Sequence, residues 1–189
     1  MILLNKTSMI YVSMIQNNFI QELNINLDIE YITNLVMNKQ NETVNGRPTH
    51  HRLVADDPYM TSLKNKYPLL SSVYNIYPLP PYKGIPLHID RDRSCAFNIP
   101  IQGTENTHTI FYKADNIILE YDDKRIYDLI KSPVTEVFRN TLIRPSLINN
   151  TIPHEVTNDK DTMRITLSWS LQKGVTFQQA IECFNEPVL

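Results

Sequence analysis

The sequence lacks several features that mark particular classes of protein. It has only two cysteines in 189 residues, Cys95 and Cys183. Two cysteines are too few for a disulfide framework, and their spacing matches no zinc motif. A chain with so few cysteines suits the reducing cytoplasm, where we expect this protein to work.

Long apolar runs are also missing. The N-terminal stretches 2–4 and 9–15 are largely apolar, but polar residues interrupt them, so we expect no signal peptide. A membrane-spanning helix needs about 20 apolar residues, and no segment approaches that length. We therefore expect no membrane span.

A charge excess of one sign is absent as well. The chain has 18 Lys and Arg residues against 20 Asp and Glu residues, for a formal net charge of −2. Such a balance gives no strong nucleic-acid signal and no overall attraction to an anionic membrane. With 42% hydrophobic residues, the chain is long enough to bury a core as one domain.

Two histidines and one aspartate form the most informative pattern in the chain. His88 and Asp90 are two residues apart, and Pro86 favours an extended backbone just before them. Residues i and i+2 of a strand project from the same face, so both side chains can converge on one ion. With His154 they would complete the two-imidazole, one-carboxylate set that holds non-heme Fe(II) by one face. The alternatives are a solvated strand end and Asp92 as the carboxylate.

A segment of alternating polarity follows the second histidine. Over 163–171 polar and apolar residues alternate, which predicts a strand with Arg164 and Thr166 on its polar face. If that face lines a barrel interior, the Arg164 charge must be paired, and a guanidinium can grip a carboxylate bidentately. If the face is exposed, Arg164 is an ordinary surface residue. Arg144 is a second candidate for a carboxylate anchor.

Short β-rich runs separated by polar turns fill the chain from Leu69 onward, at a spacing typical of a sandwich or barrel. The predicted strands are 69–77, 86–89, 94–101, 107–113, 117–121, 134–138, 141–144, 154–157 and 163–171. Helices are predicted after an Asp28 cap, after an Asp57 cap, and over 176–184. The segment 41–57 is expected to be a long loop.

These elements predict a mainly β fold, a double-stranded β-helix of the jelly-roll or cupin-like kind with flanking N-terminal and C-terminal helices. Such a barrel would return His154 to the neighbourhood of His88. Within a single domain over 1–189 we expect three parts. They are an N-terminal helical and loop region (1–68), the double-stranded β-helix core (69–171) and a C-terminal helix (172–189). In the core, alternation lets only one of Phe97 and Asn98 face inward.

The order and spacing of the site residues resemble a known enzyme family, the Fe(II)- and 2-oxoglutarate-dependent dioxygenases. The resemblance covers 73–171, and residues 153–156 followed by Arg164 also look like the prolyl- and aspartyl-hydroxylase relatives. It rests on the H-x-D pattern of His88 and Asp90, on His154, and on a basic residue, Arg164, ten positions later.

Two further segments are similar to the plant-type branch of this family. Residues 75–78 (Asn-Ile-Tyr-Pro) resemble its N-x-Y-P strand, and residues 164–166 resemble its R-x-S motif with threonine supplying the hydroxyl. The resemblance implies Fe(II), 2-oxoglutarate and O2 as cofactor and cosubstrates, with no catalytic residue beyond the metal ligands. The implied metal ligands are His88, Asp90 and His154. The implied 2-oxoglutarate contacts are Arg164, Thr166 and Tyr77.

Two other functions compete with this hypothesis. In a cupin without oxygenase activity the same barrel binds a metal, often with further ligands; Glu155 is the obvious extra candidate, and Arg164 would lack a purpose. A nucleic-acid-oxidising member of the same family usually has a second arginine shortly after the first, and no arginine follows Arg164. The sequence leaves the oligomeric state open.

The expected rim of the pocket is mixed in charge. We expect it to form from the segment 41–57 and from the turn after the first two ligands. Its charged and basic side chains are Arg47, His50, His51, Arg52, Arg91, Arg93, Glu42, Asp56, Asp57 and Asp92. A mixed rim with a basic excess fits a peptide or a small polar substrate better than a fatty acyl chain or a long duplex.

Overall fold

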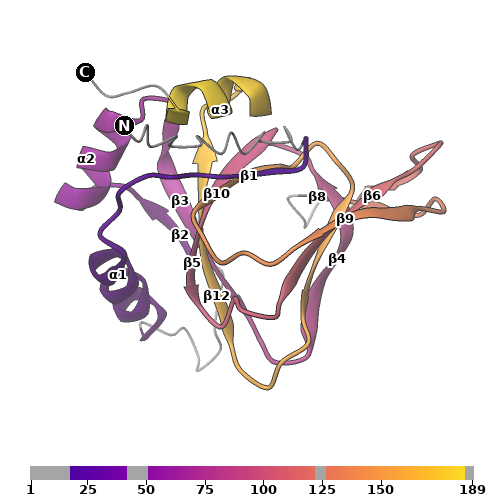
Figure 1. Ribbon diagram of the computed structural model, residues 1–189, viewed down its shortest axis with the longest axis horizontal. Helices are drawn as coiled ribbons and strands as arrows, with labels where there is room; N and C mark the ends of the chain where they lie inside the picture. The colour runs from indigo at the N-terminus through magenta and orange to yellow at the C-terminus, as the bar shows by residue number, and fades with distance from the viewer. Residues whose placement is uncertain (1–17, 42–50, 122–126, 186–189) are drawn as a thin grey trace, which may run out of the picture.

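Two antiparallel six-stranded sheets face each other in a computed structural model that describes residues 18–41, 51–121 and 127–185 (Figure 1). The strand order of the first sheet is β1 (Ile20–Glu22), β10 (Ser146–Asn149), β5 (Cys95–Gln102), β12 (Arg164–Leu171), β3 (Leu70–Leu79), β2 (His51–Val54). The order of the second sheet is β7 (Leu119–Glu120), β8 (Tyr127–Ile130), β4 (Lys83–Asp90), β11 (His154–Asn158), β6 (His108–Lys113), β9 (Thr135–Asn140).

The path of the chain between the sheets defines the fold. From β3 to β6, and again from β9 to β12, each strand lies in the sheet opposite to the one before it. The chain therefore winds around the barrel rather than completing one sheet at a time. This winding is that of a double-stranded β-helix, as the sequence predicts.

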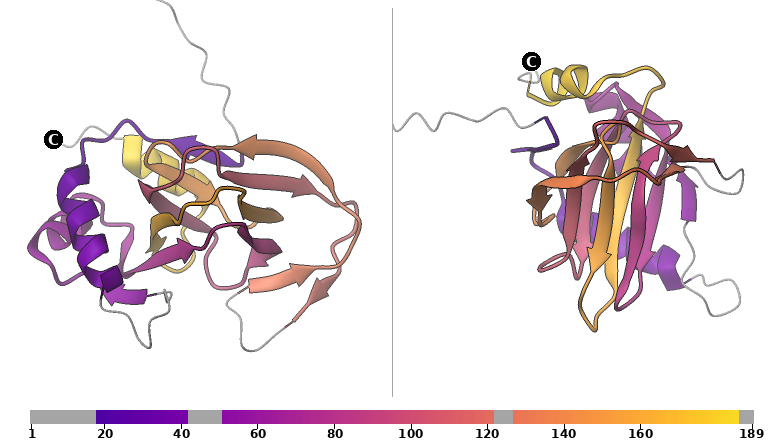
Figure 2. Two further views of the ribbon diagram at one scale, coloured as in Figure 1. Left: turned by 90° about the horizontal axis from the view of Figure 1, so that it is seen from below. Right: turned by 90° about the vertical axis from the view of Figure 1, so that its right-hand side faces the viewer.

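Three helices pack against the first sheet. They are α1 (Ile29–Asn41), α2 (Pro58–Lys66) and α3 (Phe177–Asn185). Helices α1 and α2 flank the outer side of the sheet, and α3 lies across one end of its strands (Figure 2). Their apolar side chains join those of β3, β5 and β12 in the main hydrophobic core. Among the described residues, no helix has both the length and the apolar character needed to cross a membrane.

The first two helices begin at the predicted caps. The Asp28 carboxylate accepts a hydrogen bond from the backbone N–H of Tyr31 (2.9 Å). The Asp57 carboxylate accepts bonds from the N–H groups of Tyr59 (2.9 Å) and Met60 (3.2 Å), and Pro58 occupies the first turn. Each cap satisfies N–H groups that have no partner inside the helix, which is why both helices start there.

Strand β12 divides the core from the barrel interior. Its side chains alternate, and Leu167 and Trp169, both fully buried, belong to the core beneath the helices. Thr166 and Ser168 alternate with these two residues along the strand. They are also buried, but they line a pocket inside the barrel. The polar face of this strand is therefore an interior face, and it is not exposed to solvent.

Several predicted elements are corrected by the structure. The segment 41–57 is not all loop, because β2 lies within it and pairs with β3; residues 42–50 lie outside the described part. The region 1–68 thus adds both edge strands, β1 and β2, to the first sheet. Residues 141–144 form no strand, and the strand in this stretch is β10 instead. Strands β1, β2 and β10 are short, and hydrogen bonding to distant strands stabilises them more than their local sequence pattern does.

The layered core gives a first prediction. Replacing Leu167 by alanine should lower the free energy of unfolding by about 2–5 kcal/mol, because it leaves a cavity under the helices. The exposed Ile143, changed to alanine in the same way, should cost less than about 0.5 kcal/mol. Urea unfolding followed by circular dichroism measures both, and equal losses would contradict this arrangement of layers.

Candidate metal centre

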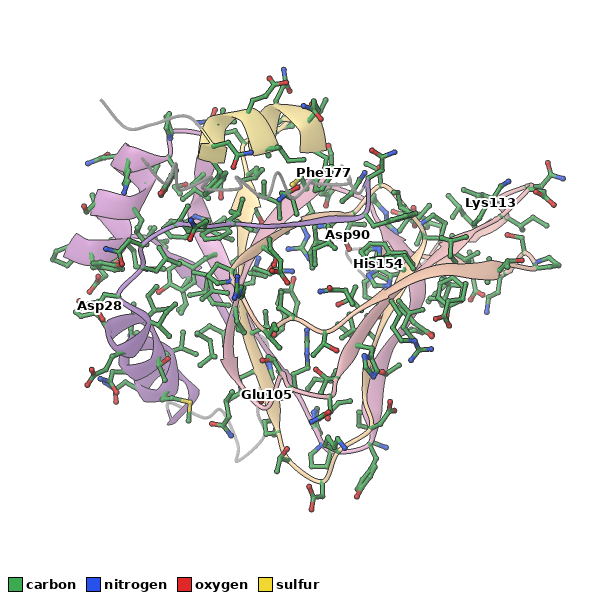
Figure 3. All side chains as sticks on the ribbon, in the orientation of Figure 1. Asp28, Asp90, Glu105, Lys113, His154 and Phe177 are labelled. Atoms are coloured by element: carbon green, nitrogen blue, oxygen red, sulfur yellow. The ribbon has the colours of Figure 1, made fainter. Side chains whose placement is uncertain are left out.

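The pairing of β4 with β11 brings the two histidines of the predicted ligand set together. His88 lies directly opposite His154 in this antiparallel pair, and their ring centroids are 4.2 Å apart. Asp90 follows on the same face of β4, with its Oδ1 3.4 Å from Nε2 of His88. One ligand atom from each of the three residues lies within 4.8 Å of the others, and all three side chains are buried. Asp90 and His154 are labelled in Figure 3.

Hydrogen bonds turn the same nitrogen of each imidazole toward the cluster. Nδ1 of His88 lies 2.7 Å from the carbonyl oxygen of Pro86, and Nδ1 of His154 lies 2.8 Å from that of Ile152. A carbonyl only accepts, so each Nδ1 carries a proton, and in the neutral ring the lone pair then lies on Nε2, the nitrogen turned toward the cluster. Burial, together with the nearby His88, lowers the pKa of His154 to about 4. The ring is thus neutral at pH 7, as a metal ligand must be.

Asp90 is held as a carboxylate by its neighbours. Burial alone would raise its pKa, but the Arg93 guanidinium and the His88 ring outweigh burial and hold the pKa at about 2. Nε of Arg93 donates to Oδ2 of Asp90 over 2.5 Å. The other carboxylate oxygen, Oδ1, is the one that faces His88. Two imidazoles and one carboxylate match a non-heme Fe(II) site.

A pocket of about 470 Å³, counting its mouth, opens beside the three ligands. It lies between the two sheets, and side chains from both sheets line it. They are Tyr77, Ile85, His88, Arg93, Asn98, Thr109, Ile148, Asn150, His154, Val156, Arg164, Thr166 and Ser168.

Arg164 lies in this pocket as a buried cation. Only 4% of it is exposed, and its Nε donates to Oγ1 of Thr107 over 3.1 Å. Burial lowers its pKa to about 10, so the guanidinium stays charged at pH 7. Among the described residues no carboxylate pairs with it. A buried charge without a counterion is costly, so the site favours an anionic ligand.

Unpartnered polar atoms add to this demand for a ligand. In the described part of the chain, Oγ1 of Thr109, Oγ1 of Thr166, Oδ1 of Asn98 and Nδ2 of Asn150 are buried without a hydrogen-bond partner, and all four residues line the pocket. Buried polar atoms in native proteins are nearly always satisfied. The two threonine hydroxyls can donate to a carboxylate bound at Arg164, and Thr166 shares the inner face of β12 with that residue.

Of the other predicted site residues, Tyr77 and Arg164 lie in the pocket, while Arg144 and Asp92 do not. Tyr77 lines the pocket, and burial raises the pKa of its hydroxyl, whereas Tyr74 packs against Trp169 in the helix-side core. Arg144 is exposed, which leaves Arg164 as the buried guanidinium of the two. Asp92 is also exposed, beyond the end of β4.

The alternation of side chains along β5 and β11 decides which residues face the pocket. Phe97 packs in the helix-side core and its neighbour Asn98 faces the pocket. Glu155, next to His154 on β11, accepts a hydrogen bond from the Tyr112 hydroxyl on the opposite side of the strand from the ligands. Glu155 therefore does not join the ligand set.

Some residues of the site were missed or misplaced by sequence reasoning. Arg93 was expected on the rim but lies in the pocket against Asp90, and Arg91 pairs with Asp128 instead. Thr109 and Asn150 were not predicted. Thr109 could have been found from the alternation of the strand 107–113, whereas nothing in the local sequence marks Asn150. The expected rim residues within 42–50 lie outside the described part of the chain.

Comparison with known proteins supports the fold. No family model and no curated protein matches the chain. A prolyl-4-hydroxylase from Pseudomonas putida aligns over 80% of this chain and 90% of its own, with 12% identity and a TM-score of 0.51. The non-heme alpha-ketoglutarate-dependent carbocyclase SnoK from nogalamycin biosynthesis aligns over 82% and 79%, with 12% identity and a TM-score of 0.50.

A third solved structure, EvdMO1, aligns over 85% of this chain but only 48% of its own, with 14% identity and a TM-score of 0.51. At such low identities these similarities concern the fold. They confirm the predicted double-stranded β-helix with flanking helices, and they confirm the resemblance to the dioxygenase family at the level of the fold. The ligand and cosubstrate roles of individual residues stay predictions.

The ligand set gives a second prediction. The purified protein should bind one Fe(II) or Mn(II) per chain, and His88→Ala or His154→Ala should abolish this binding because each removes one of three ligands. Isothermal titration under anaerobic conditions measures it. His108→Ala is the control, since its ring contacts Thr141 away from the cluster. Metal binding at full strength in both ligand variants would rule out this site.

Proposed function

We propose that the protein is an Fe(II)- and 2-oxoglutarate-dependent dioxygenase that oxidises a peptidyl or other small polar substrate. One observation carries the proposal: a set of two histidines and one aspartate shares a pocket with a buried guanidinium. That guanidinium, of Arg164, has no carboxylate partner among the described residues. A dicarboxylate that reached from the ion to Arg164 would supply the missing counterion.

Three side chains would hold the metal. His88, Asp90 and His154 would hold Fe(II), and the backbone carbonyls bonded to each Nδ1 fix the orientation of the rings. The bound metal supplies the oxidising chemistry, in which O2 is consumed and 2-oxoglutarate is decarboxylated to succinate as the substrate is oxidised.

The chain's own groups would position the cosubstrate. Arg164 would bind its far carboxylate, with the Thr166 and Thr109 hydroxyls as further donors that have no other partner in the described part of the structure. Ile85 and Val156 line the same pocket and would exclude water from the ion pair. In a dry site a guanidinium–carboxylate pair is much stronger than in water.

The two competing functions are less well supported. A cupin without oxygenase activity would leave the buried Arg164 charge unexplained, and Glu155 is turned away from the ligands. An enzyme acting on long nucleic acid would need a basic surface, which the net charge of −2 does not favour. The cupin alternative leaves Arg164 without a role. A nucleic-acid-oxidising enzyme of the same family would use Arg164 in the same way, and the charge of the chain alone disfavours it.

Two asparagine side chains that line the pocket support a polar substrate. Asn98 presents a buried acceptor oxygen and Asn150 a buried donor N–H, both without partners in the described part of the chain. A peptide or carboxamide group offers both a donor and an acceptor and would satisfy them. An apolar chain would leave both unsatisfied, at about 1–3 kcal/mol for each.

A third prediction tests the cosubstrate site. Arg164→Ala should weaken binding of 2-oxoglutarate by roughly two to four orders of magnitude, because losing one partner of a buried ion pair costs about 3–5 kcal/mol. Titration of the Mn(II)-loaded protein measures it, and the affinity for Mn(II) should change little. The exposed Arg144, changed to alanine, is the matched control. If 2-oxoglutarate affinity falls in Arg144→Ala and not in Arg164→Ala, then Arg144 and not Arg164 binds the far carboxylate.

A fourth prediction tests the substrate. A peptide library should contain members that gain the mass of one oxygen atom and speed succinate formation, while nucleosides and single-stranded DNA should not. Asn150→Leu should lower turnover of the oxidised peptide but spare the slow succinate formation seen without it, because the variant removes a substrate contact only. Asn34→Leu, at an exposed helical position, is the control. Oxidation confined to the nucleic acids would reverse the choice of substrate.

A further inference from the structure

Arg93 lies where the chain crosses from one sheet to the other. Strand β4 of the second sheet ends at Asp90, and β5 of the first sheet begins at Cys95. The short connection between them therefore spans the barrel beside the metal ligands. The Arg93 side chain turns back from this connection into the pocket, where it is about one-fifth exposed.

The Arg93 guanidinium contacts both sheets. Its Nε donates to Oδ2 of Asp90 over 2.5 Å, on the second sheet. Its Nη1 donates to Oγ of Ser168 over 3.0 Å, on β12 of the first sheet. The guanidinium also lies over the ring of Tyr77 on β3, 5.6 Å from the centroid.

These contacts divide the Asp90 carboxylate between two tasks. Oδ2 is occupied by Arg93, while Oδ1 lies 3.4 Å from Nε2 of His88. Two ligand atoms, each about 2.1 Å from an octahedral ion, are about 3 Å apart. The carboxylate is thus held with Oδ1 toward His88 and Oδ2 on Arg93, so it would offer a bound ion a single oxygen.

We propose that Arg93 is a positioning residue that fixes Asp90 as a one-oxygen ligand and ties its position to the sheet that carries Arg164, Thr166 and Tyr77. The proposal rests on the metal site proposed above. Through Arg93, a shift of the metal ligand and a shift of β12 or β3 are coupled. Metal binding should therefore strengthen cosubstrate binding less when this link is broken.

A planar guanidinium is required for this role. Arginine presents several donors in a rigid fork, so it can bond Asp90 and Ser168 at once and stack on the Tyr77 ring. Lysine carries the same charge as a point on a flexible stem and has no flat face. If only charge mattered, lysine would replace Arg93 without loss.

The experiment compares four variants of the full-length protein: Arg93→Gln, Arg93→Lys, Ser168→Ala and, as matched control, Arg91→Gln. Arg91 is two residues away, and its guanidinium pairs with Asp128 as that of Arg93 pairs with Asp90. The readouts are Mn(II) affinity by titration, the visible spectrum of bound Co(II), 2-oxoglutarate affinity with and without Mn(II), and the thermal unfolding temperature.

We expect Arg93→Gln and Arg93→Lys to weaken Mn(II) binding by roughly 10- to 100-fold, the loss typical of removing a partner of a metal ligand. Their Co(II) spectra should change, because Asp90 is free to turn. Ser168→Ala should keep most of the metal affinity but reduce the gain in 2-oxoglutarate affinity on adding Mn(II). Arg91→Gln should match the unchanged protein in every readout.

Other outcomes would overturn the inference. If the Arg93 variants lose thermal stability but keep Mn(II) affinity and the Co(II) spectrum, Arg93 is only a structural ion pair. Full metal affinity in Arg93→Lys would show that charge alone is needed. If the Arg93 variants do not fold, Ser168→Ala still decides the question. If adding Mn(II) raises its 2-oxoglutarate affinity as much as in the unchanged protein, Arg93 does not couple the two sheets. Absence of metal binding in the unchanged protein would instead refute the proposed function itself.

Discussion

The antiparallel pairing of β4 with β11 is the constraint on which the rest of the site depends. It places His88 opposite His154, and the two-residue period of β4 then adds Asp90 on the same face. A slip of one residue in either strand would turn that strand's ligands to the other face of the sheet. The register must therefore be specified strongly. The hydrogen bonds from each Nδ1 to a carbonyl two residues earlier fix ring orientation within that register.

A second constraint is the charge inside the barrel. Two guanidiniums, of Arg93 and Arg164, line the pocket. Among the described residues, one carboxylate, that of Asp90, pairs with Arg93, and none pairs with Arg164. Asp90 balances Arg93, so Arg164 remains without a counterion. A ligand that supplies the missing negative charge binds the folded chain and not the unfolded one. Such binding stabilises the fold by mass action. The unpaired Arg164 charge therefore destabilises the ligand-free protein and strengthens the binding of an anionic ligand.

How much of this could be predicted from the sequence depends on the range of the interaction. The ligand pair His88 and Asp90, the caps at Asp28 and Asp57, and the two faces of β12 follow from periods of two to four residues, and sequence patterns report them. Strands β1, β2, β8 and β10 could not be predicted in this way. They are short, and distant partners rather than local alternation hold them in the sheets.

The placement of Arg93 shows the same limit within the site. The sequence from Asp90 to Arg93 alternates in charge and is typical of a solvated turn. Its conformation is set by the crossing from β4 to β5. Arg93 donates to Ser168, which lies 75 residues further along the chain on β12. No periodicity encodes that meeting. The same holds for Asn150, whose carbonyl accepts from the Asp90 N–H only because β10 ends beside it.

The low identities to proteins of the same fold follow from what each part of the barrel requires. The core beneath the helices needs apolar side chains of suitable volume on one face of β12, and many combinations provide them. The pocket face needs particular atoms: an Nε2 lone pair, a carboxylate oxygen, a guanidinium. A barrel of this kind can therefore change most of its sequence and keep its fold. Its chemistry is then decided by the few inward-facing polar side chains, and its substrate by the groups that reach the pocket from the connections, as Arg93 does here.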